Sequence, residues 1–122
     1  MKKTFIETVR FTNWVKEYLS DDVLSDLQRD LQNDPETGSV MPGCGGLRKM
    51  RVADSRRGKG RRGGARVIYL HVAEADIIFV MDVYGKGEQE DLTAAQKKVL
   101  KGLAEGFKQA AIEAARASHK ET

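Results

Sequence analysis

Two basic side chains, Lys49 and Arg51, are the first residues in the chain whose type and spacing suggest chemistry. They belong to "LRKMRV", a predicted strand over residues 47–52, and residues two apart on a strand share a face at about 6.5–7 Å. That separation is comparable to one phosphate step of an extended nucleic acid strand, so the pair could grip consecutive phosphates. The alternative is a half-exposed strand face that happens to be basic.

The charge of the sequence is concentrated around that pair. Residues 48–66 contain nine lysines or arginines and one acid, Asp54, whereas the segments before and after each carry a net negative charge and the whole chain sums to +3. An acidic frame around one intensely basic segment is typical of a protein that binds a polyanion. A solvated basic loop is the alternative interpretation.

Two further residues, Arg66 and Tyr84, come from the strongest strand signals in the chain. "RVIYLHV" and "DIIFVMDVY" are joined by the short "AEA", which predicts an antiparallel hairpin. With a three-residue loop, Val72 pairs with Asp76. Arg66 then faces Asp82 across the hairpin, and Tyr84 lies one same-face step farther along. A four-residue loop would break this alignment, because a slip of one residue turns the side chains to the other face.

We expect these residues and Lys86 to converge at the end of the sheet that the basic loop enters. Arginine forks bind phosphate oxygens in a bidentate manner and stabilise charge that develops during phosphoryl transfer. Tyr84 could stack on a base or handle a proton. Crowding among cations disfavours the ammonium form of a lysine, which makes Lys49 a candidate base, and the 2′-hydroxyl of RNA would supply the nucleophile.

Other chemistries lack the residues that they need. The sequence has no carboxylate-rich motif for a two-metal nuclease, no His-x-x-x-His and no Gly-x-x-x-x-Gly-Lys-Ser/Thr loop, so we expect neither a metal nor a cofactor. The two histidines, His71 and His119, offer no acid–base pair, and His71 is expected to be a packed or edge residue in mid-strand. Cys44 is the only cysteine and is interpreted as a small loop residue.

Periodicity and capping signals predict the elements that must position these side chains. A strand at about residues 4–8 precedes two short helices, the first capped by Thr12 or Asn13 and the second opened by Ser20. Residues 35–46 are predicted as a loop. Thr93 with Gln96 forms a capping box for a last helix that should cover the sheet.

The resulting order, β-α-α-β-β-β-α, predicts one α+β domain with a mostly antiparallel, four-stranded sheet flanked by helices. The segment after Phe107 is helix-prone but nearly without large apolar residues, and we expect it to continue the helix and to fray near Ser118. No apolar run reaches the roughly 20 residues that cross a membrane, and the N-terminus has no signal-peptide pattern, so a cytoplasmic protein is expected.

Several segments together resemble a known family. In order, "EYLSDD", "GGLRKMRVA", "GKGRRGGARVIYL", "VYGKGE" and "DLTAAQKKVL" are similar to toxins of the RelE/ParE superfamily, above all the HigB-like RelE toxins of bacterial type II toxin–antitoxin pairs. The resemblance covers roughly residues 4–107. It implies a compact RelE-like fold with a twisted sheet, one toxin domain at residues 1–107 and a C-terminal helical extension at residues 108–122.

The resemblance also implies an activity. Such toxins are endoribonucleases that enter the ribosomal A site and cut the mRNA codon there by metal-free attack of the 2′-hydroxyl, leaving a 2′,3′-cyclic phosphate and a 5′-hydroxyl. Carried over by motif, the catalytic residues would be Lys49, Arg51, Arg66, Tyr84 and Lys86. The residues expected to contact ribosomal RNA or the mRNA backbone are Arg48, Arg56, Arg57, Lys59, Arg61 and Arg62. The implied partners are the ribosome and a HigA/RelB-like, operator-binding antitoxin with an acidic or amphipathic segment.

The sequence departs from the family pattern at one point, and two other functions stay open. Some RelE toxins use a C-terminal tyrosine, but no tyrosine follows Tyr84 here, which leaves the general base open. A ParE-like inhibitor of DNA gyrase without nuclease activity is one alternative, because a fold does not determine a function. A non-catalytic RNA-binding protein, in which the same cations only hold phosphates, is the other.

Overall fold

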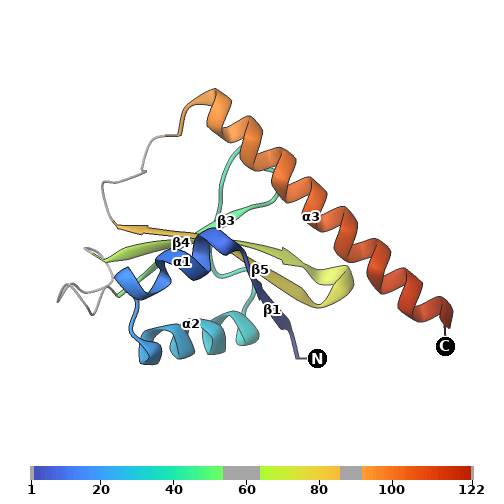
Figure 1. The fold of residues 1–122 in the computed structure, drawn as a ribbon, viewed down its shortest axis with the longest axis horizontal. Coiled ribbons are helices and arrows are strands. Elements are labelled where there is room, and N and C mark those ends of the chain that lie inside the picture. Colours follow the sequence, from blue (N-terminus) through green and yellow to red (C-terminus); the bar gives the residue numbers. More distant parts are fainter. Residues whose placement is uncertain (1, 54–63, 86–91, 122) are drawn as a thin grey trace.

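The computed structural model describes residues 2–53, 64–85 and 92–121 (Figure 1). The elements in chain order are β1 (Thr4–Glu7), α1 (Val9–Tyr18), α2 (Asp21–Asn33), β2 (Ser39–Val40), β3 (Arg48–Val52), β4 (Ala65–Val72), a 3-10 turn (Ala73–Ala75), β5 (Ile77–Gly85) and α3 (Ala94–Glu121). The α+β class predicted from the sequence is confirmed.

One mixed sheet forms the middle of the fold. Its strand order is β1-β5-β4-β3-β2; β1 runs parallel to β5, and the other neighbours are antiparallel. The sheet therefore has five strands where the sequence predicted four. The additional strand, β2, is two residues long and lies in the segment that we expected to be a loop.

Tertiary contacts explain why that segment joins the sheet. The Tyr69 hydroxyl of β4 accepts a hydrogen bond from the Gly38 N–H at 2.9 Å. From β3, Arg48 Nη1 donates to the carbonyl oxygens of Glu36 and Gly38 at 3.1 and 2.8 Å. These bonds hold residues 36–38 beside β3, so that Ser39 pairs with Lys49. None of them is visible in the local sequence, which has turn composition.

Helices cover both faces of the sheet (Figure 1). On one face, α1 and α2 bury Phe11, Val15, Leu27 and Leu31 against β4 and β5. On the other face, α3 and the loop after β2 pack against the alternate residues of the same strands, including Ile68 and Leu70. Strands β4 and β5 are thus buried on both faces, which explains their nearly continuous apolar sequence.

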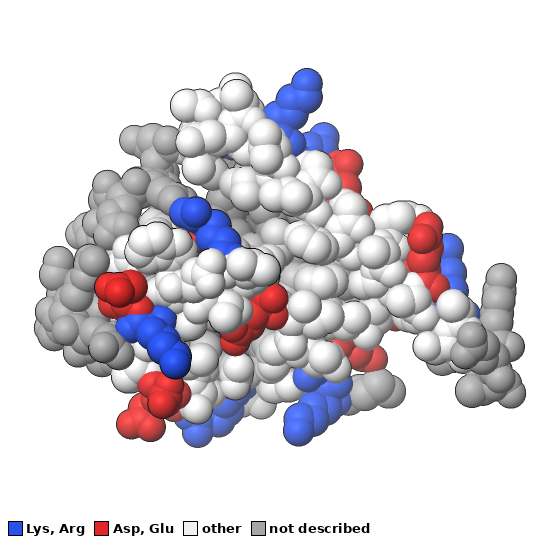
Figure 2. All heavy atoms as spheres, viewed as in Figure 1, with Lys and Arg blue, Asp and Glu red and all other residues white. Residues whose placement is uncertain are grey.

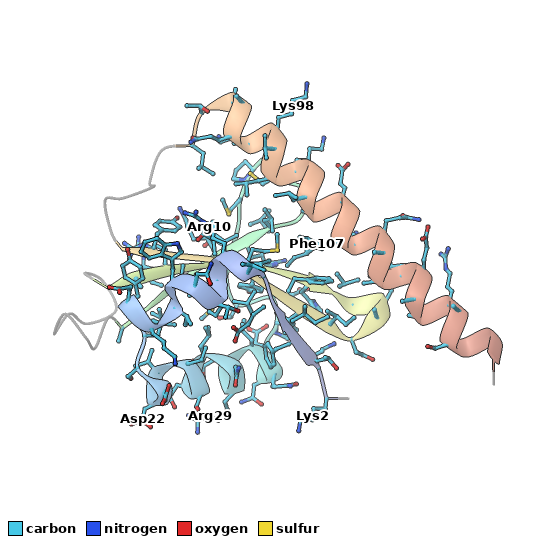
Figure 3. The ribbon with its side chains drawn as sticks, viewed as in Figure 1. Lys2, Arg10, Asp22, Arg29, Lys98 and Phe107 are labelled. Atoms are coloured by element: carbon cyan, nitrogen blue, oxygen red, sulfur yellow. The ribbon has the colours of Figure 1, made fainter. Side chains whose placement is uncertain are left out.

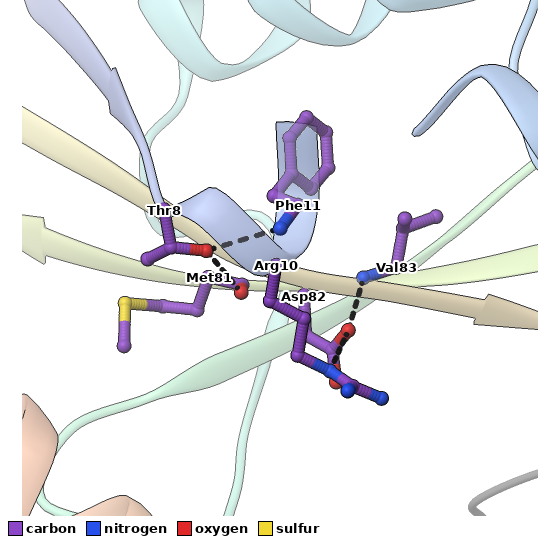
Figure 4. A network of polar contacts seen from close by, with 6 residues as sticks. All are labelled: Thr8, Arg10, Phe11, Met81, Asp82 and Val83. Atoms are coloured by element: carbon purple, nitrogen blue, oxygen red, sulfur yellow. Dashed lines mark hydrogen bonds and ion pairs between the residues drawn. The ribbon is translucent and has the colours of Figure 1, made fainter. Parts of the chain in front are cut away.

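The first helix begins earlier than predicted. Thr8, not Thr12 or Asn13, is the N-cap: its Oγ1 accepts a hydrogen bond from the Phe11 N–H at 3.2 Å. The Thr8 hydroxyl also donates to the Met81 carbonyl at 2.7 Å, so the cap is tied to β5 (Figure 4). The alternating pattern of "TFIETVRF" suggested a longer strand, but this contact with β5 ends the strand and starts the helix.

The other caps are as predicted. Ser20 Oγ accepts from the Val23 N–H at 3.3 Å at the start of α2. At the start of α3, Thr93 Oγ1 accepts from the Gln96 N–H at 3.1 Å, and Gln96 Oε1 accepts from the Thr93 N–H at 2.9 Å. This reciprocal pair is a capping box, which satisfies two backbone donors that the helix leaves free.

α3 continues without a break from Ala94 to Glu121. Residues 108–121 therefore belong to the same helix as residues 94–107, while a domain boundary at residue 107 and fraying near Ser118 stay predictions. Across the part of the chain that the structure describes, no helix has an apolar stretch long enough to cross a membrane.

The loop between β2 and β3 packs closely against α3. Met41, Cys44 and Leu47 are buried there, in the core beneath the helix. Gly45 has a φ of +70°, and a Cβ added to it would lie 3.1 Å from the Lys101 carbonyl oxygen. A side chain at this position would thus meet both backbone strain and the helix.

We predict that Gly45→Ala destabilises the fold more than Gly43→Ala. Gly43 has the same left-handed backbone, with a φ of +72°, but an added Cβ there meets nothing within 4 Å. Gly43→Ala should therefore cost about 1 kcal/mol from backbone strain alone, and Gly45→Ala should add the cost of moving α3. Urea unfolding of both variants measures the difference. Equal losses would mean that the loop does not hold α3 closely.

Candidate functional site

Three of the predicted site residues lie in one row across the sheet. Arg51 of β3 pairs with Arg66 of β4, and Arg66 pairs with Tyr84 of β5. Directly paired residues on neighbouring strands project from the same face. Lys49 follows in the next row, opposite Ile68 of β4. The four residues, predicted from three separate strands, therefore share one face, the face that α3 partly covers.

Two register shifts produce the row. The turn of the hairpin takes four residues, because Asp76 adopts a left-handed conformation with a φ of 53° and Val72 pairs with Ile77. A β-bulge between Ile68 and Tyr69 then shifts the register a second time. One slip turns the side chains over, and the second slip turns them back.

The pairs predicted for the hairpin were accordingly wrong in detail. Val72 does not pair with Asp76, and Arg66 lies opposite Tyr84, not opposite Asp82, which pairs with Ile68. The predicted loop of three residues was one residue too short. Arg66, Asp82 and Tyr84 nevertheless share a face, because the bulge compensates for the longer turn.

The row changes from exposed to buried across the sheet. Arg51 is exposed and Lys49 half-buried, whereas Arg66 and Tyr84 retain only 5% and 3% of their surface. Arg66 Nη1 donates a hydrogen bond to the Gly64 carbonyl at 3.2 Å. Arg51 on β3 is thus open to a large ligand and Lys49 partly so, while Arg66 and Tyr84, nearer the centre of the sheet, are enclosed by their surroundings.

Arg48 does not join this group. It pairs with Tyr69, which belongs to the core beneath α1 and α2, so its side chain leaves the opposite face of β3. There its guanidinium donates to the carbonyls of Glu36 and Gly38. Its predicted contact with RNA stays a prediction. The other residues predicted for the site lie outside the described residues: Lys86, Arg56, Arg57, Lys59, Arg61 and Arg62.

His71 also points away from the row. It alternates with Leu70 and Val72, which face α3, and pairs with Ile78, which belongs to the core on the other face. Burial, and then the charge of Lys3, lower the pKa of His71 below its usual value. A neutral imidazole on the far face has no part in the chemistry of the row.

A cation that the sequence did not single out, Arg10, lies beside the row. Its Nε donates to Asp82 Oδ1 at 2.8 Å, and the same carboxylate oxygen accepts from the Val83 N–H at 2.8 Å (Figure 4). Arg10 and Asp82 are 72 positions apart, so no local spacing could reveal the pair. Asp82 is buried, but the Arg10 side chain is half-exposed.

Burial dominates the electrostatics of this pair. It raises the pKa of the Asp82 carboxyl above its usual value of 3.8, against the opposing effects of the Arg10 guanidinium and the Val83 N–H. The cost of removing the carboxylate from water is therefore larger than the stabilisation of its charge by the two donors. Within the described ranges, no group of three or more His, Cys, Asp or Glu side chains could hold a metal ion.

The sequence match spans nearly the whole chain. Residues 2–121 match the family described as the RelE toxin of the RelE/RelB toxin–antitoxin system. The chain belongs to the RelE toxin family. It is therefore a toxin of a toxin–antitoxin pair, and membership implies an antitoxin as its partner. The match also includes the C-terminal residues that lay outside the motifs noted above.

One solved structure of RelE agrees with the fold, and a second is less similar. A double mutant of the E. coli toxin RelE in the free state superposes with a TM-score of 0.54 at 21% identity, over 82% of this chain and 99% of that one. The isolated E. coli RelE toxin gives a TM-score of 0.48 at 18% identity, over 83% of this chain and 98% of its own. At such identity the first comparison supports the RelE fold alone.

Next to the row, this RelE family member has an apolar groove of about 690 Å3 between the start of α3, the start of α1 and β5. Figure 2 shows a broad, mostly uncharged surface in this region, although Arg10 and Asp82 also line the groove. Ile68 and Asp82, which pair across β4 and β5, contribute to its wall. The groove and the row of site residues thus adjoin on the same face of the sheet.

We predict that the stability of Asp82→Asn relative to the wild type increases from acidic to neutral pH. A raised pKa means that the folded state prefers the protonated carboxyl, so the contribution of Asp82 is favourable below pH 3.8 and is lost as the pH rises through the raised value. Asparagine keeps an oxygen for Arg10 and Val83 but has no charge to bury. Melting temperatures of both proteins between pH 3 and 7 measure this effect.

The melting temperature of the wild type should fall relative to that of the variant as the pH rises. At pH 7 the wild type should be no more stable than the variant. If the melting temperature of the wild type instead rises relative to that of Asp82→Asn over this range, the attraction of Arg10 has a larger effect on the Asp82 carboxyl than its burial.

Proposed function

We propose that this toxin is a ribosome-dependent endoribonuclease that cuts mRNA in the A site by metal-free attack of the 2′-hydroxyl on the adjacent phosphate. Membership of the RelE family supports a toxin that stops translation. The observation that carries the nuclease proposal is the row of Arg51, Arg66 and Tyr84 on three neighbouring strands, with Lys49 on the same face. Such a row can hold one extended nucleic acid backbone.

Lys49 and the three residues of the row each have a proposed role. Lys49 is the candidate base for the proton of the 2′-hydroxyl, whose oxygen attacks the phosphorus while the bond to the 5′ oxygen breaks, and water supplies the proton that the departing 5′ oxygen takes up. Arg51 and Arg66 neutralise the charge that gathers on the phosphate oxygens. Tyr84 supplies a hydroxyl or a stacking surface to the reacting nucleotide. The products are a 2′,3′-cyclic phosphate and a 5′-hydroxyl.

The burial of Arg66 and Tyr84 sets a condition on this mechanism. With 5% and 3% of their surface exposed, neither side chain can reach a phosphate unless neighbouring groups move when RNA binds. Arg51 is already exposed, and Lys49 is only half-buried. We infer that the two residues on β3 meet the RNA first, and that the two nearer the centre engage as the complex closes.

The proposal extends to residues outside the described ranges. Lys86 would join the catalytic group, and the basic segment with Arg56, Arg57, Lys59, Arg61 and Arg62 would hold ribosomal RNA or the mRNA backbone through phosphate contacts, which are sequence-independent and salt-sensitive. Arg48 would contribute only if its bonds to Glu36 and Gly38 were released. No cofactor enters the proposed chemistry.

We predict that inducing the protein in bacteria stops growth and creates mRNA ends inside codons. The ends should disappear when an inhibitor blocks the initiation of translation before induction, because the proposed reaction needs an mRNA held in the A site. Mapping of RNA 5′ ends with and without the inhibitor measures this. Arrested DNA replication with intact mRNA would instead identify a gyrase inhibitor.

We also predict that Lys49→Ala, Arg51→Ala and Tyr84→Phe each lower cleavage by about 100-fold or more in a ribosome assay. Arg51 is exposed, so its loss should leave the fold intact, and Tyr84→Phe removes only the hydroxyl. Arg29→Ala on α2, an exposed arginine paired with Asp26, removes the same charge on the opposite face of the sheet from the row and is the matched control. It should cleave like the wild type.

Two outcomes would contradict the site. If all three variants stay fully active, the row does not carry the reaction. If the wild type binds RNA but leaves it uncut, and Arg51→Ala only weakens binding and its salt dependence, the protein is an RNA-binding module without catalysis.

A further inference from the structure

Arg10 is held at one edge of its guanidinium and presents the other edge to solvent. Its Nε donates to Asp82 Oδ1 at 2.8 Å, and its side chain keeps 54% of its surface. The two terminal nitrogens bind no other described residue, and Figure 4 shows them beyond the Nε that contacts the carboxylate. A guanidinium has five N–H donors, and a fork of two fits a phosphate. Arg10 can therefore bind a second anion while Asp82 holds it in place.

The position of Asp82 suits a group that orients Arg10. Asp82 is the only charged residue of β5, and it is buried. A buried ion pair often stabilises a protein no better than apolar side chains of similar volume. Asp82 does, however, fix a long side chain that otherwise samples many rotamers, and a fixed donor loses less entropy when it binds a ligand.

The start of α1 brings Arg10 to the edge of the sheet. β1 pairs with residues 77–80 of β5, and beyond them α1 takes its place beside the strand. There the Thr8 hydroxyl donates to the Met81 carbonyl at 2.7 Å. Arg10 then reaches Asp82 on the face that α3 partly covers, and Figure 3 shows Arg10 on this side of the sheet.

This position places Arg10 beside the row of site residues. Asp82 is one same-face step from Tyr84 on β5, and Tyr84 pairs with Arg66 on β4. Arg66 in turn pairs with Arg51 on β3. Cations therefore lie on both sides of Tyr84, and an RNA strand that crossed the row from β3 to β5 would next meet Arg10.

Trp14 is a large exposed side chain one helical turn after Arg10. It keeps 48% of its surface and is not among the described residues packed in either core. Positions i and i+4 lie on the same side of a helix, about 6 Å apart along its axis. α1 runs beside β5 in the direction of that strand (Figure 1). Trp14 therefore lies beyond Arg10 toward the end of β5 that carries Tyr84.

Arg10 and Trp14 together have the side chains that bind one nucleotide. A guanidinium fork binds a phosphate, and an indole ring stacks on a base whatever its identity. Tyr84, the aromatic ring of the row, keeps only 3% of its surface. An exposed stacking surface beside the site must therefore come from another residue, and Trp14 supplies one.

We propose that Arg10 and Trp14 form a subsite that holds the mRNA nucleotide next to the scissile phosphate. Arg10 binds the phosphate of that nucleotide, and Trp14 stacks on its base. The subsite deepens the proposed function and rests on its mRNA substrate, but not on cleavage. It fixes the register of the strand across the row, and because stacking tolerates every base, it adds affinity without codon preference.

The test measures the affinity of the toxin for ribosomes whose A site holds an mRNA that cannot be cut. A 2′-deoxyribose at the scissile nucleotide removes the nucleophile and leaves the phosphates and bases in place. The variants are Arg10→Ala, Trp14→Ala and Trp14→Phe, with melting temperatures as a check of folding. Lys16→Ala is the matched control, because it removes an exposed cation of the same helix at about 120° around the axis from Arg10.

Arg10→Ala and Trp14→Ala should each bind about tenfold more weakly than the wild type. Trp14→Phe keeps a stacking ring and should lose less than about threefold. Lys16→Ala should bind like the wild type. Unchanged binding by both alanine variants of the subsite would overturn the proposal, and so would a loss in Lys16→Ala that equals the loss in Arg10→Ala.

Modified mRNAs show whether the two side chains contact the mRNA or the ribosome. One set carries a single abasic nucleotide near the scissile bond, and the other carries a single uncharged methylphosphonate. The loss caused by Trp14→Ala should vanish at one abasic position, and the loss caused by Arg10→Ala at one methylphosphonate position, because the partner is then already absent. Losses that persist on every modified mRNA would assign both residues to ribosome contacts and overturn the proposal.

A double variant replaces Arg10→Ala if the buried Asp82 carboxylate, left without its partner, prevents folding. Arg10→Ala/Asp82→Asn buries no unpaired charge and keeps an amide oxygen for the Val83 N–H. It should bind the uncut mRNA complex more weakly than Asp82→Asn alone. Equal affinity of the two proteins would contradict a phosphate contact by Arg10.

Cleavage of ordinary mRNA by the same proteins separates the two proposals. If the wild type leaves mRNA uncut while the losses vanish on the modified mRNAs as expected, the nuclease proposal fails and the subsite stands. If the wild type cuts mRNA but the Arg10 and Trp14 variants bind and cut like it, the subsite fails and the nuclease proposal stands.

Discussion

The pairing of β4 with β5 is the constraint on which the rest of the structure depends. These strands are buried on both faces, so each residue must suit either the core beneath α1 and α2 or the core beneath α3. A single slip would place Arg66 and Asp82 on opposite faces of the sheet, so that one of them would enter the apolar core under α1 and α2, where a charge without a partner is costly. The four-residue turn and the β-bulge together avoid this, and they keep the polar residues of both strands on the α3 face.

The same arrangement determines which charges are held and which are free. Asp82 is buried, and its carboxylate is fixed by Arg10 and by the Val83 N–H; Arg66 is buried beside Tyr84. Fixed polar groups lose little entropy when a ligand binds, which favours catalysis by electrostatic preorganisation. Arg51, at the edge of the same row, stays exposed and can meet a ligand from solution.

α3 is packed along only part of its surface. Ala104 and Ala111 are buried against the sheet and the loop at Gly45, while Val99 and Leu103 face the open groove. A long helix that leaves aliphatic side chains in water forgoes part of its own stabilisation. Any partner that covered these side chains would return that stabilisation, so its binding and the stability of the fold would be linked.

The sequence alone determined the family motifs, the α+β class, the caps at Ser20 and Thr93, and the strand positions of the four residues that form the candidate site, because these depend on local spacing and composition. The tertiary structure decided three things. The Thr8 cap depends on the Met81 carbonyl, the short β2 depends on Tyr69 and Arg48, and the Arg10–Asp82 pair joins residues 72 positions apart. The hairpin register was wrong from sequence because a left-handed Asp76 and a bulge leave no clear local signature. Such features arise from contacts between segments that are far apart in the chain, and these contacts have no local pattern in the amino-acid sequence.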